Sequence, residues 1–167
     1  MRSRALQVGG RVLREKDQMG TGSQGFRHTA ECLRFMALNI HGFSMRVYPH
    51  TYDAKAYACD SFEPYTTDLF EKSVHSNATV LDIGAQFGYY TLLAARAVGA
   101  GGTVVAFEPE PSNLALLRQN ISLNPFVSAV RVVPHAVSET DSIRELFIYE
   151  GSDSHSLHRH PKVVVKE

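Results

Sequence analysis

The spacing of hydrophobic and polar residues predicts a β-hairpin in the first third of the chain. Residues 33–38 and 43–48 are two β-compatible runs of mostly apolar side chains, and the break between them contains Gly42. Two such runs around a glycine-containing break are typical of a hairpin. Residues 1–30 lack this pattern and are rich in Gly, Arg, Ser and Gln. We therefore expect residues 1–30 to be a flexible arm and residues 31–167 to form the folded domain.

A helix is expected after the hairpin, beginning just after Pro64 with Thr66 or Thr67 as its N-cap. The spacing of apolar residues extends this helix to about residue 74. Its buried side is predicted to carry Leu69, Phe70 and Val74. The hairpin and this helix would then precede the main sheet of the domain.

Short apolar runs alternate with helical patterns in the second half of the chain. The expected strands are 79–83, 103–107 and 130–133, and the expected helices are 89–97 and 111–123. Nearly continuous apolar runs of this length are typical of buried parallel strands. The β-α-β-α-β order predicts a parallel sheet with right-handed crossovers. The predicted fold class is therefore α/β, with a doubly wound sheet.

Composition and charge argue against several classes of partner. Lys and Arg number 17, as do Asp and Glu, so the formal net charge is zero. A balanced charge gives no support for a nucleic-acid partner or for electrostatic binding to a membrane. No apolar run approaches the ~18 residues of a transmembrane helix. Cys32 and Cys59 match no metal or redox spacing, and His155, His158 and His160 match no zinc pattern, so we expect no metal and a reducing, cytoplasmic location.

Candidate chemistry lies at the predicted carboxyl ends of the first two strands, where ligands bind in open α/β sheets. Gly84 and Gly88 remove side chains where the chain turns sharply, which either lets a ligand lie against the backbone or serves strand–helix packing. Glu108 ends the second strand, where its carboxylate could accept hydrogen bonds from both hydroxyls of a ribose or remain a solvated acid. Asp82 precedes the glycine turn and could hold the loop or bind a ligand ammonium.

The glycine spacing also discriminates between cofactors. A dinucleotide-binding turn normally reads Gly-x-Gly-x-x-Gly. In this chain Gln86 and Tyr89 stand where the second and third glycines would be. Because that cradle for a pyrophosphate is missing, a nicotinamide dehydrogenase is disfavoured. A ligand with a ribose and an amino acid end but no diphosphate fits better, and S-adenosylmethionine is such a ligand.

Several segments of the chain resemble a known family. They are residues 62–67, 80–91, 104–109, 117–124 and 132–138. These segments are similar to the FkbM-type S-adenosylmethionine-dependent methyltransferases, and the resemblance spans roughly residues 33–158. The blocks 82–85 (Asp-Ile-Gly-Ala) and 107–109 (Phe-Glu-Pro) are quite specific to that family. The resemblance implies a Rossmann-like methyltransferase fold and O-methylation of a hydroxyl on a small molecule, a sugar or other glycan, or a lipid.

The resemblance also implies roles for individual residues. The loop around the methionine part of the cofactor would be formed by Asp82, Gly84, Ala85, Gln86 and Gly88. Glu108 would bind the ribose, and the adenine would be bordered by Pro109, His135 and Ala136. The helix entry over the cofactor would consist of Glu63, Tyr65 and Thr66. Gln86 departs from the family, which usually has Asn at this place, and the sequence assigns no catalytic base.

The end of the chain leaves little room for the rest of such a fold. Residues 143–149 predict one more strand, and residues 163–165 could begin another. Each further strand-and-helix unit needs roughly 30 residues. We therefore expect the C-terminal strands, and an acidic stretch that the family places near its substrate, to be missing. The alternative function is a non-catalytic half-domain that binds the cofactor or a partner, with an exposed sheet edge through which a homodimer could form.

Overall fold

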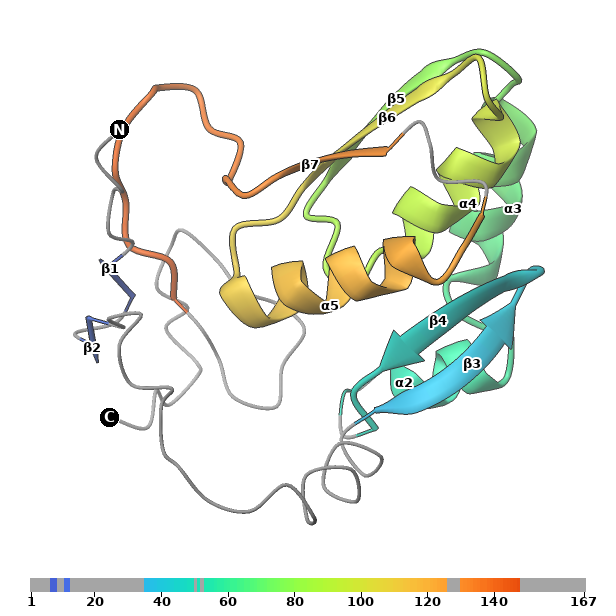
Figure 1. Ribbon diagram of the computed structural model, residues 1–167, viewed down its shortest axis with the longest axis horizontal. Coiled ribbons are helices and arrows are strands. Elements are labelled where there is room, and N and C mark those ends of the chain that lie inside the picture. Colours follow the sequence, from blue (N-terminus) through green and yellow to red (C-terminus); the bar gives the residue numbers. More distant parts are fainter. Residues whose placement is uncertain are drawn as a thin grey trace.

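The computed structural model describes residues 35–49, 51, 53–125 and 130–147, together with two short strands nearer the N-terminus (Figure 1). Those strands, β1 (Gln7–Val8) and β2 (Arg11–Val12), form an antiparallel pair. The rest of the arm predicted over residues 1–30 lies outside the described residues, as do the three histidines 155, 158 and 160 and the run 163–165. None of the helices in the described ranges is long and apolar enough to cross a membrane.

The expected hairpin is formed by strands β3 (Met36–Ile40) and β4 (Phe43–Val47), which pair in antiparallel register. The two residues of the turn, His41 and Gly42, have positive φ angles of 45° and 80°. Positive φ at both central residues gives a turn whose twist matches that of the flanking strands. Alternate residues of β4 are buried, so one face of the hairpin belongs to the core.

The central element is a parallel sheet in the order β5 (Thr79–Ile83), β6 (Thr103–Phe107) and β7 (Val130–Val133). Helices α4 (Tyr89–Val98) and α5 (Pro111–Ser122) connect these strands (Figure 1). The strands pair in parallel register without interruption. Thr79 of β5 lies opposite Thr103 of β6, and Val104 of β6 lies opposite Val130 of β7. The α/β class and the predicted β-α-β-α-β order are therefore confirmed.

Described helices cover only one face of this sheet. Val104 and Ala106 of β6 are fully buried against α4 and α5, whereas Leu81 and Ile83 of β5 are 61% and 60% exposed. The predicted burial of residues 79–83 is met only in part on the helix side, where Val80 and Asp82 are half-buried, and is wrong for the other face, which no described element covers. Of residues 143–149, expected in a further strand, residues 143–146 form no strand, Phe147 forms an isolated β-bridge, and residues 148–149 lie outside the described residues.

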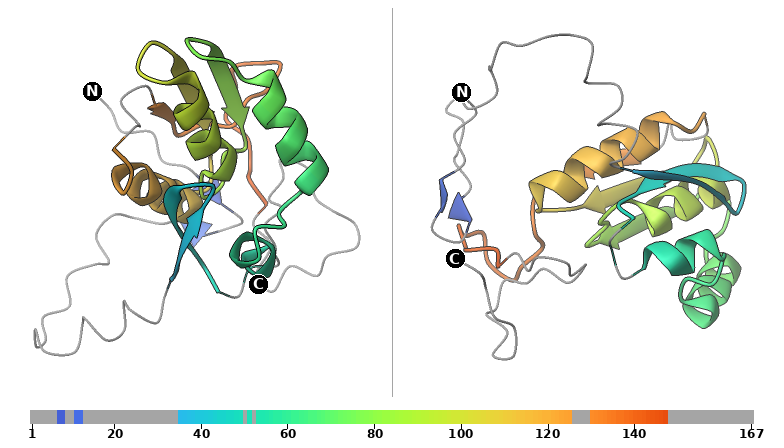
Figure 2. Two further views of the ribbon diagram at one scale, coloured as in Figure 1. Left: turned by 90° about the vertical axis from the view of Figure 1, so that its right-hand side faces the viewer. Right: turned by 90° about the horizontal axis from the view of Figure 1, so that it is seen from below.

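The side chains of Asn120 in α5 and Asn124 just after it anchor the hairpin, which packs against α4 and α5 (Figures 1 and 2). Asn120 Oδ1 accepts a hydrogen bond from the Arg46 amide (2.8 Å), and Asn120 Nδ2 donates to the Arg46 carbonyl (2.9 Å). Asn124 makes the same pair of bonds with Ser44, each 2.8 Å long. Asn120 is fully buried and also donates to the carbonyl of Phe87 (2.8 Å). These amides pair with β4 as the backbone of a neighbouring strand would.

Helix α3 (Pro64–Ser73) begins at Pro64 itself rather than just after it, and its N-cap is Glu63 rather than Thr66 or Thr67. Glu63 has a left-handed backbone with a φ of 40°. Thr67 lies inside the helix, where it is buried and donates from Oγ1 to the carbonyl of Phe62 (3.0 Å). The prediction of a threonine cap is wrong because the chain turns into the helix at Glu63, three residues before Thr66.

The packed face of α3 is narrower than predicted. Phe70 and Val74 are half-buried beside the cluster formed by α4 and β6, as expected. Leu69 is 66% exposed, so its predicted burial is wrong. The short helix α2 (Ala54–Ala58), which sequence analysis did not predict, precedes α3 and buries Ala54 and Tyr57. The inward side of α3 is therefore limited to a single stripe.

Candidate functional site

A cavity of about 410 Å³ lies at the carboxyl ends of β5 and β6. On the sheet side it is lined by Asp82, Gly84, Ala85, Gln86, Glu108, Pro109 and Asn113. On the opposite side it is lined by Asp53, Tyr57, Phe62, Glu63, Tyr89 and Tyr90, and Leu146 from the segment after β7 also lines it. Its volume and position are those of a small-molecule site in an α/β sheet. This cavity is therefore the candidate functional site.

The two glycines of the β5–α4 turn have different surroundings. Gly84 has a φ of 83°, and a Cβ added to it would meet no atom within 4 Å. Gly88 has a φ of 97°, and its added Cβ would lie 2.6 Å from Cδ1 of the buried Leu117. Gly84 lines the cavity, whereas Gly88 is absent from the lining that the described residues provide. Gly84 thus leaves backbone open to a ligand, and Gly88 lets α5 pack closely against the turn.

The carboxylate of Glu108 lies at the floor of the cavity and is only 4% exposed, so it is not a solvated acid. Its Oε2 accepts a hydrogen bond from the Gln86 amide (2.8 Å), and its Oε1 accepts one from the Glu110 amide (2.9 Å). Burial raises the pKa of Glu108, and these two backbone bonds, together with a weaker interaction with the Asn113 side chain, oppose that rise. A carboxylate has about four acceptor positions, so about two remain for the hydroxyls of a ligand.

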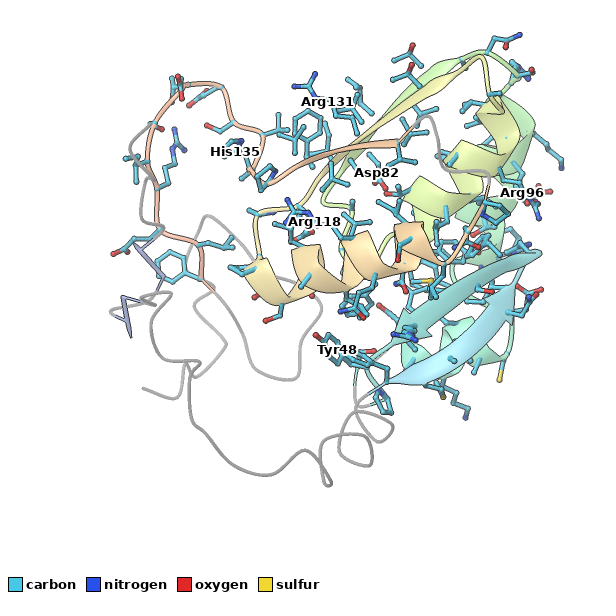
Figure 3. The ribbon with its side chains drawn as sticks, in the orientation of Figure 1. Tyr48, Asp82, Arg96, Arg118, Arg131 and His135 are labelled. Atoms are coloured by element: carbon cyan, nitrogen blue, oxygen red, sulfur yellow. The ribbon has the colours of Figure 1, made fainter. Side chains whose placement is uncertain are left out.

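Asp82 holds the loop and also lines the cavity. Its side chain accepts a hydrogen bond from Thr91 Oγ1, which links the end of β5 to the first turn of α4. Figure 3 shows Asp82 on the side of β5 that faces this helix. Burial raises the pKa of Asp82, and the bond from Thr91 opposes the rise. Both roles left open for this residue, holding the loop and facing a ligand, are therefore compatible with its position.

Gln86 carries a strained backbone at the tip of the same turn. Its φ is 50°, a left-handed conformation that costs a residue other than glycine or asparagine about 1–2 kcal/mol. The Gln86 amide is bonded to Glu108, and its side-chain Oε1 accepts a weak hydrogen bond from the Tyr57 hydroxyl (3.4 Å). The turn is therefore held from both sides of the cavity.

The wall opposite the sheet consists of aromatic rings. Tyr57 and Phe62 have ring centroids 4.4 Å apart, and Tyr89 and Tyr90 have centroids 5.1 Å apart. The Tyr90 hydroxyl donates a hydrogen bond to Glu63 Oε2 (2.8 Å). Burial above all raises the pKa of Tyr90 to about 12, so its hydroxyl keeps the proton at neutral pH. This aromatic wall was not predicted as a unit, although the segments 62–67 and 80–91 of the family resemblance contained Phe62, Tyr89 and Tyr90.

Besides Gly88, four of the predicted site residues are not among the described residues that line the cavity. Tyr65 is 90% exposed and Thr66 is exposed, because both follow the Glu63 cap on the solvent side of α3. His135 and Ala136 are exposed in the segment after β7, where Figure 3 labels His135. The structure instead brings in Asp53, Tyr57 and Asn113, for which the sequence carried no recognisable motif.

A family model, described as the methyltransferase FkbM domain, matches residues 82–166 of the chain. The match begins at Asp82, later than the resemblance noted from residue 33, and it extends past residue 158. It contains the glycine turn, Glu108 and the start of α5, which form the sheet side of the cavity. No curated protein matches the chain.

Solved methyltransferase structures share limited similarity with the chain. Methanocaldococcus jannaschii Trm5 in complex with adenosine is 19% identical over 62% of this chain and 30% of its own, with a TM-score of 0.46. P. horikoshii TYW2 in complex with MeSAdo is 16% identical over 62% of this chain and 37% of its own, with a TM-score of 0.44. A SAM-dependent O-methyltransferase from Thermotoga maritima is 23% identical over 43% of this chain and 28% of its own, with a TM-score of 0.40. The chain thus spans well under half the length of each of these structures.

Proposed function

The chain belongs to the FkbM methyltransferase family, and from this premise we propose that it binds S-adenosylmethionine and transfers the methyl group to a hydroxyl of a small molecule, a glycan or a lipid. The observation that carries the proposal is the cavity where the β5–α4 turn faces Glu108. Gly84 leaves space against the backbone there, and Glu108 retains acceptor positions for two neighbouring hydroxyls.

The residues present fit the parts of such a cofactor. The open surface at Gly84 would take the amino acid part, with Asp82 beside it as the partner of an ammonium group. The ribose hydroxyls would donate to Glu108, and Pro109 would lie beside the base. Because the lining combines apolar rings with a few convergent polar groups, it has the character of a small-molecule site.

When bound, the cofactor supplies a methyl group that its sulfonium has already activated. The protein would then hold the donor in one orientation and align an acceptor oxygen in line with it. The aromatic wall of Tyr57, Phe62, Tyr89 and Tyr90 would keep water from the reacting atoms. Alignment and exclusion of water are therefore the contributions that we assign to this site.

Calorimetric titration with S-adenosylhomocysteine, compared with NAD, tests the proposed cofactor. We expect saturable heat with S-adenosylhomocysteine and none with NAD, because the turn lacks the glycines of a pyrophosphate cradle. No heat with S-adenosylhomocysteine at millimolar concentration would remove the cofactor from the proposal. Saturable binding of NAD alone would favour a dehydrogenase.

A second candidate function, a non-catalytic domain that binds a partner, is favoured by the uncovered face of the sheet. Leu81 and Ile83 are both mostly exposed, and β5 pairs only with β6 within the described sheet. An apolar edge strand of this kind favours pairing with a second copy of the chain. Sedimentation velocity at increasing concentration should then show a dimer that Leu81→Lys converts to a monomer. A wild-type chain that stays monomeric at every concentration would rule this candidate out.

We also propose that the chain works in the cytoplasm. The support is the exposed free thiol of Cys59, which a reducing compartment would preserve. Fractionation of cells that produce the chain would test this, and recovery from an oxidising compartment would contradict it.

A further inference from the structure

The carboxylates that line the cavity stand on two sides of it. Asp82 and Glu108 belong to the sheet side, and Asp53 and Glu63 belong to the aromatic wall. The described residues that line the cavity include no Lys, Arg or His. S-adenosylmethionine has two positive centres, an ammonium and a sulfonium. The proposed function places Asp82 beside the ammonium and Glu108 beside the ribose. The sulfonium is then the positive centre that the carboxylates of the aromatic wall can bind.

Glu63 is a carboxylate of that wall whose orientation the structure fixes. Its Oε2 accepts the hydrogen bond from the Tyr90 hydroxyl (2.8 Å), and its backbone is set by the left-handed turn that precedes Pro64. Tyr90 is neutral at physiological pH, so the hydrogen bond orients the carboxylate without neutralising its charge. No other described group is bonded to the second carboxylate oxygen, and Glu63 is exposed at the edge of the cavity.

The rings beside Glu63 reinforce the preference for a cation. Phe62 lies next to Glu63 in the chain, and its ring contacts those of Tyr57 and Tyr90 at centroid distances of 4.4 Å and 6.2 Å. The faces of aromatic rings attract positive charge, and they do so more strongly where water is excluded. A carboxylate and several aromatic rings thus converge on one side of the cavity.

We propose that Glu63, oriented by Tyr90, recognises the positively charged sulfonium of S-adenosylmethionine and so distinguishes the methyl donor from its uncharged product. This inference rests on the proposed function, since it takes the cavity to be the cofactor site. S-adenosylhomocysteine keeps the adenosine and amino acid parts but has a neutral thioether. The wall therefore favours binding of the donor over binding of the spent product.

Calorimetry with three ligands tests the proposal without the need for a known acceptor. The ligands are S-adenosylmethionine, S-adenosylhomocysteine, and sinefungin, in which a carbon bearing an amino group replaces the sulfonium. In Glu63→Gln we expect the affinity for the two ligands with a positive centre there to fall about tenfold, the effect of losing one charge–charge interaction at a partly solvated site. The affinity for S-adenosylhomocysteine should change less than about twofold, because that centre is absent.

Two further variants control the experiment. Tyr90→Phe keeps the ring but removes the bond to Glu63, so it should reproduce the selective loss at smaller size, and it carries the test if circular dichroism shows Glu63→Gln to be unfolded. Asp68→Asn removes an equal charge from the exposed side of α3, where Asp68 pairs with Lys72 (2.7 Å), and should leave all three affinities unchanged. An equal loss for all three ligands, or no loss for any, would overturn the inference. Failure of the wild-type chain to bind any of the three would instead refute the proposed function.

Discussion

The anchor of the hairpin and the floor of the cavity both bury polar side chains, but they use them differently. At the anchor, the fully buried amide of Asn120 makes three hydrogen bonds, all to backbone groups. At the floor, Glu108 is almost as buried, yet its two backbone bonds leave about half of its acceptor positions unused next to a cavity. When all hydrogen-bonding positions of a buried polar group are occupied within the protein, the group serves to stabilise the fold. When half of them remain open beside a cavity, the group is available to a ligand.

The anchor should therefore give the largest loss of stability. We expect Asn120→Ala to lower the free energy of unfolding by about 3 kcal/mol, because it leaves the Arg46 amide and the carbonyls of Arg46 and Phe87 without partners. Urea denaturation would measure the change. Gln119→Ala, one position away on the exposed side of α5, should stay within about 0.5 kcal/mol of the wild type. Equal losses of stability in the two variants would contradict the anchoring role of Asn120.

Substitution of the two glycines should likewise affect stability at one position and ligand binding at the other. Gly88→Ala should cost about 2–3 kcal/mol of stability, because its Cβ would overlap the buried Leu117 and its φ is positive. Gly84→Ala should cost only about 1 kcal/mol, since its Cβ meets open space, yet it should weaken binding of S-adenosylhomocysteine more than Gly88→Ala does. Denaturation and calorimetry on the two variants would measure both effects. The reverse order in either measurement would contradict the assignment.

Removal of the Glu108 carboxylate at the floor of the cavity should mainly lower the affinity for the ligand. We expect Glu108→Ala to weaken binding of S-adenosylhomocysteine by about 1–3 kcal/mol, the usual range for hydrogen bonds to a charged group. Calorimetry would measure the change, with circular dichroism to show that the β5–α4 turn survives the loss of the bond to Gln86. A folded variant with unchanged affinity would mean that Glu108 serves the fold alone.

The smallest expected effect is on the pH dependence of stability. Burial raises the pKa of Glu108 in the folded chain above its ordinary value of 4.5, so the folded state takes up its proton at a higher pH than the unfolded state. The native state then binds more protons in this window, and stability attributable to this group increases as pH falls from neutral toward 4.5. Glu108→Gln cannot titrate at this position. Urea denaturation should therefore show the wild type gaining stability relative to Glu108→Gln over that window, and a constant difference would contradict the raised pKa.

Local pattern was sufficient to predict the hairpin, the three parallel strands and their helices, because each depends on the periodicity of neighbouring residues. The glycine turn and Glu108 were predictable for a related reason, since strand order alone places both at one edge of the sheet. Leu81 and Ile83 show the limit of this reasoning. An apolar run predicts burial, but which face is covered depends on elements elsewhere in the chain.

The remaining differences come from contacts between distant parts of the sequence. The bonds from Asn120 to Arg46 join residues 74 positions apart, so nothing near either residue indicates them. The exposure of Tyr65 follows from the left-handed cap at Glu63, which no propensity rule favours. The aromatic wall likewise forms only when the segment from α2 to α3 packs against the start of α4.

The central claim is that the half-used carboxylate of Glu108 and the open backbone at Gly84 together hold an adenosyl cofactor. A crystal structure of the chain soaked with S-adenosylhomocysteine tests it most directly. We expect the ribose hydroxyls within hydrogen-bond distance of the Glu108 carboxylate and the amino acid part against Gly84. Density for the ligand at another place on the chain, or for Glu108 bonded only to the amides of Gln86 and Glu110, would contradict the claim.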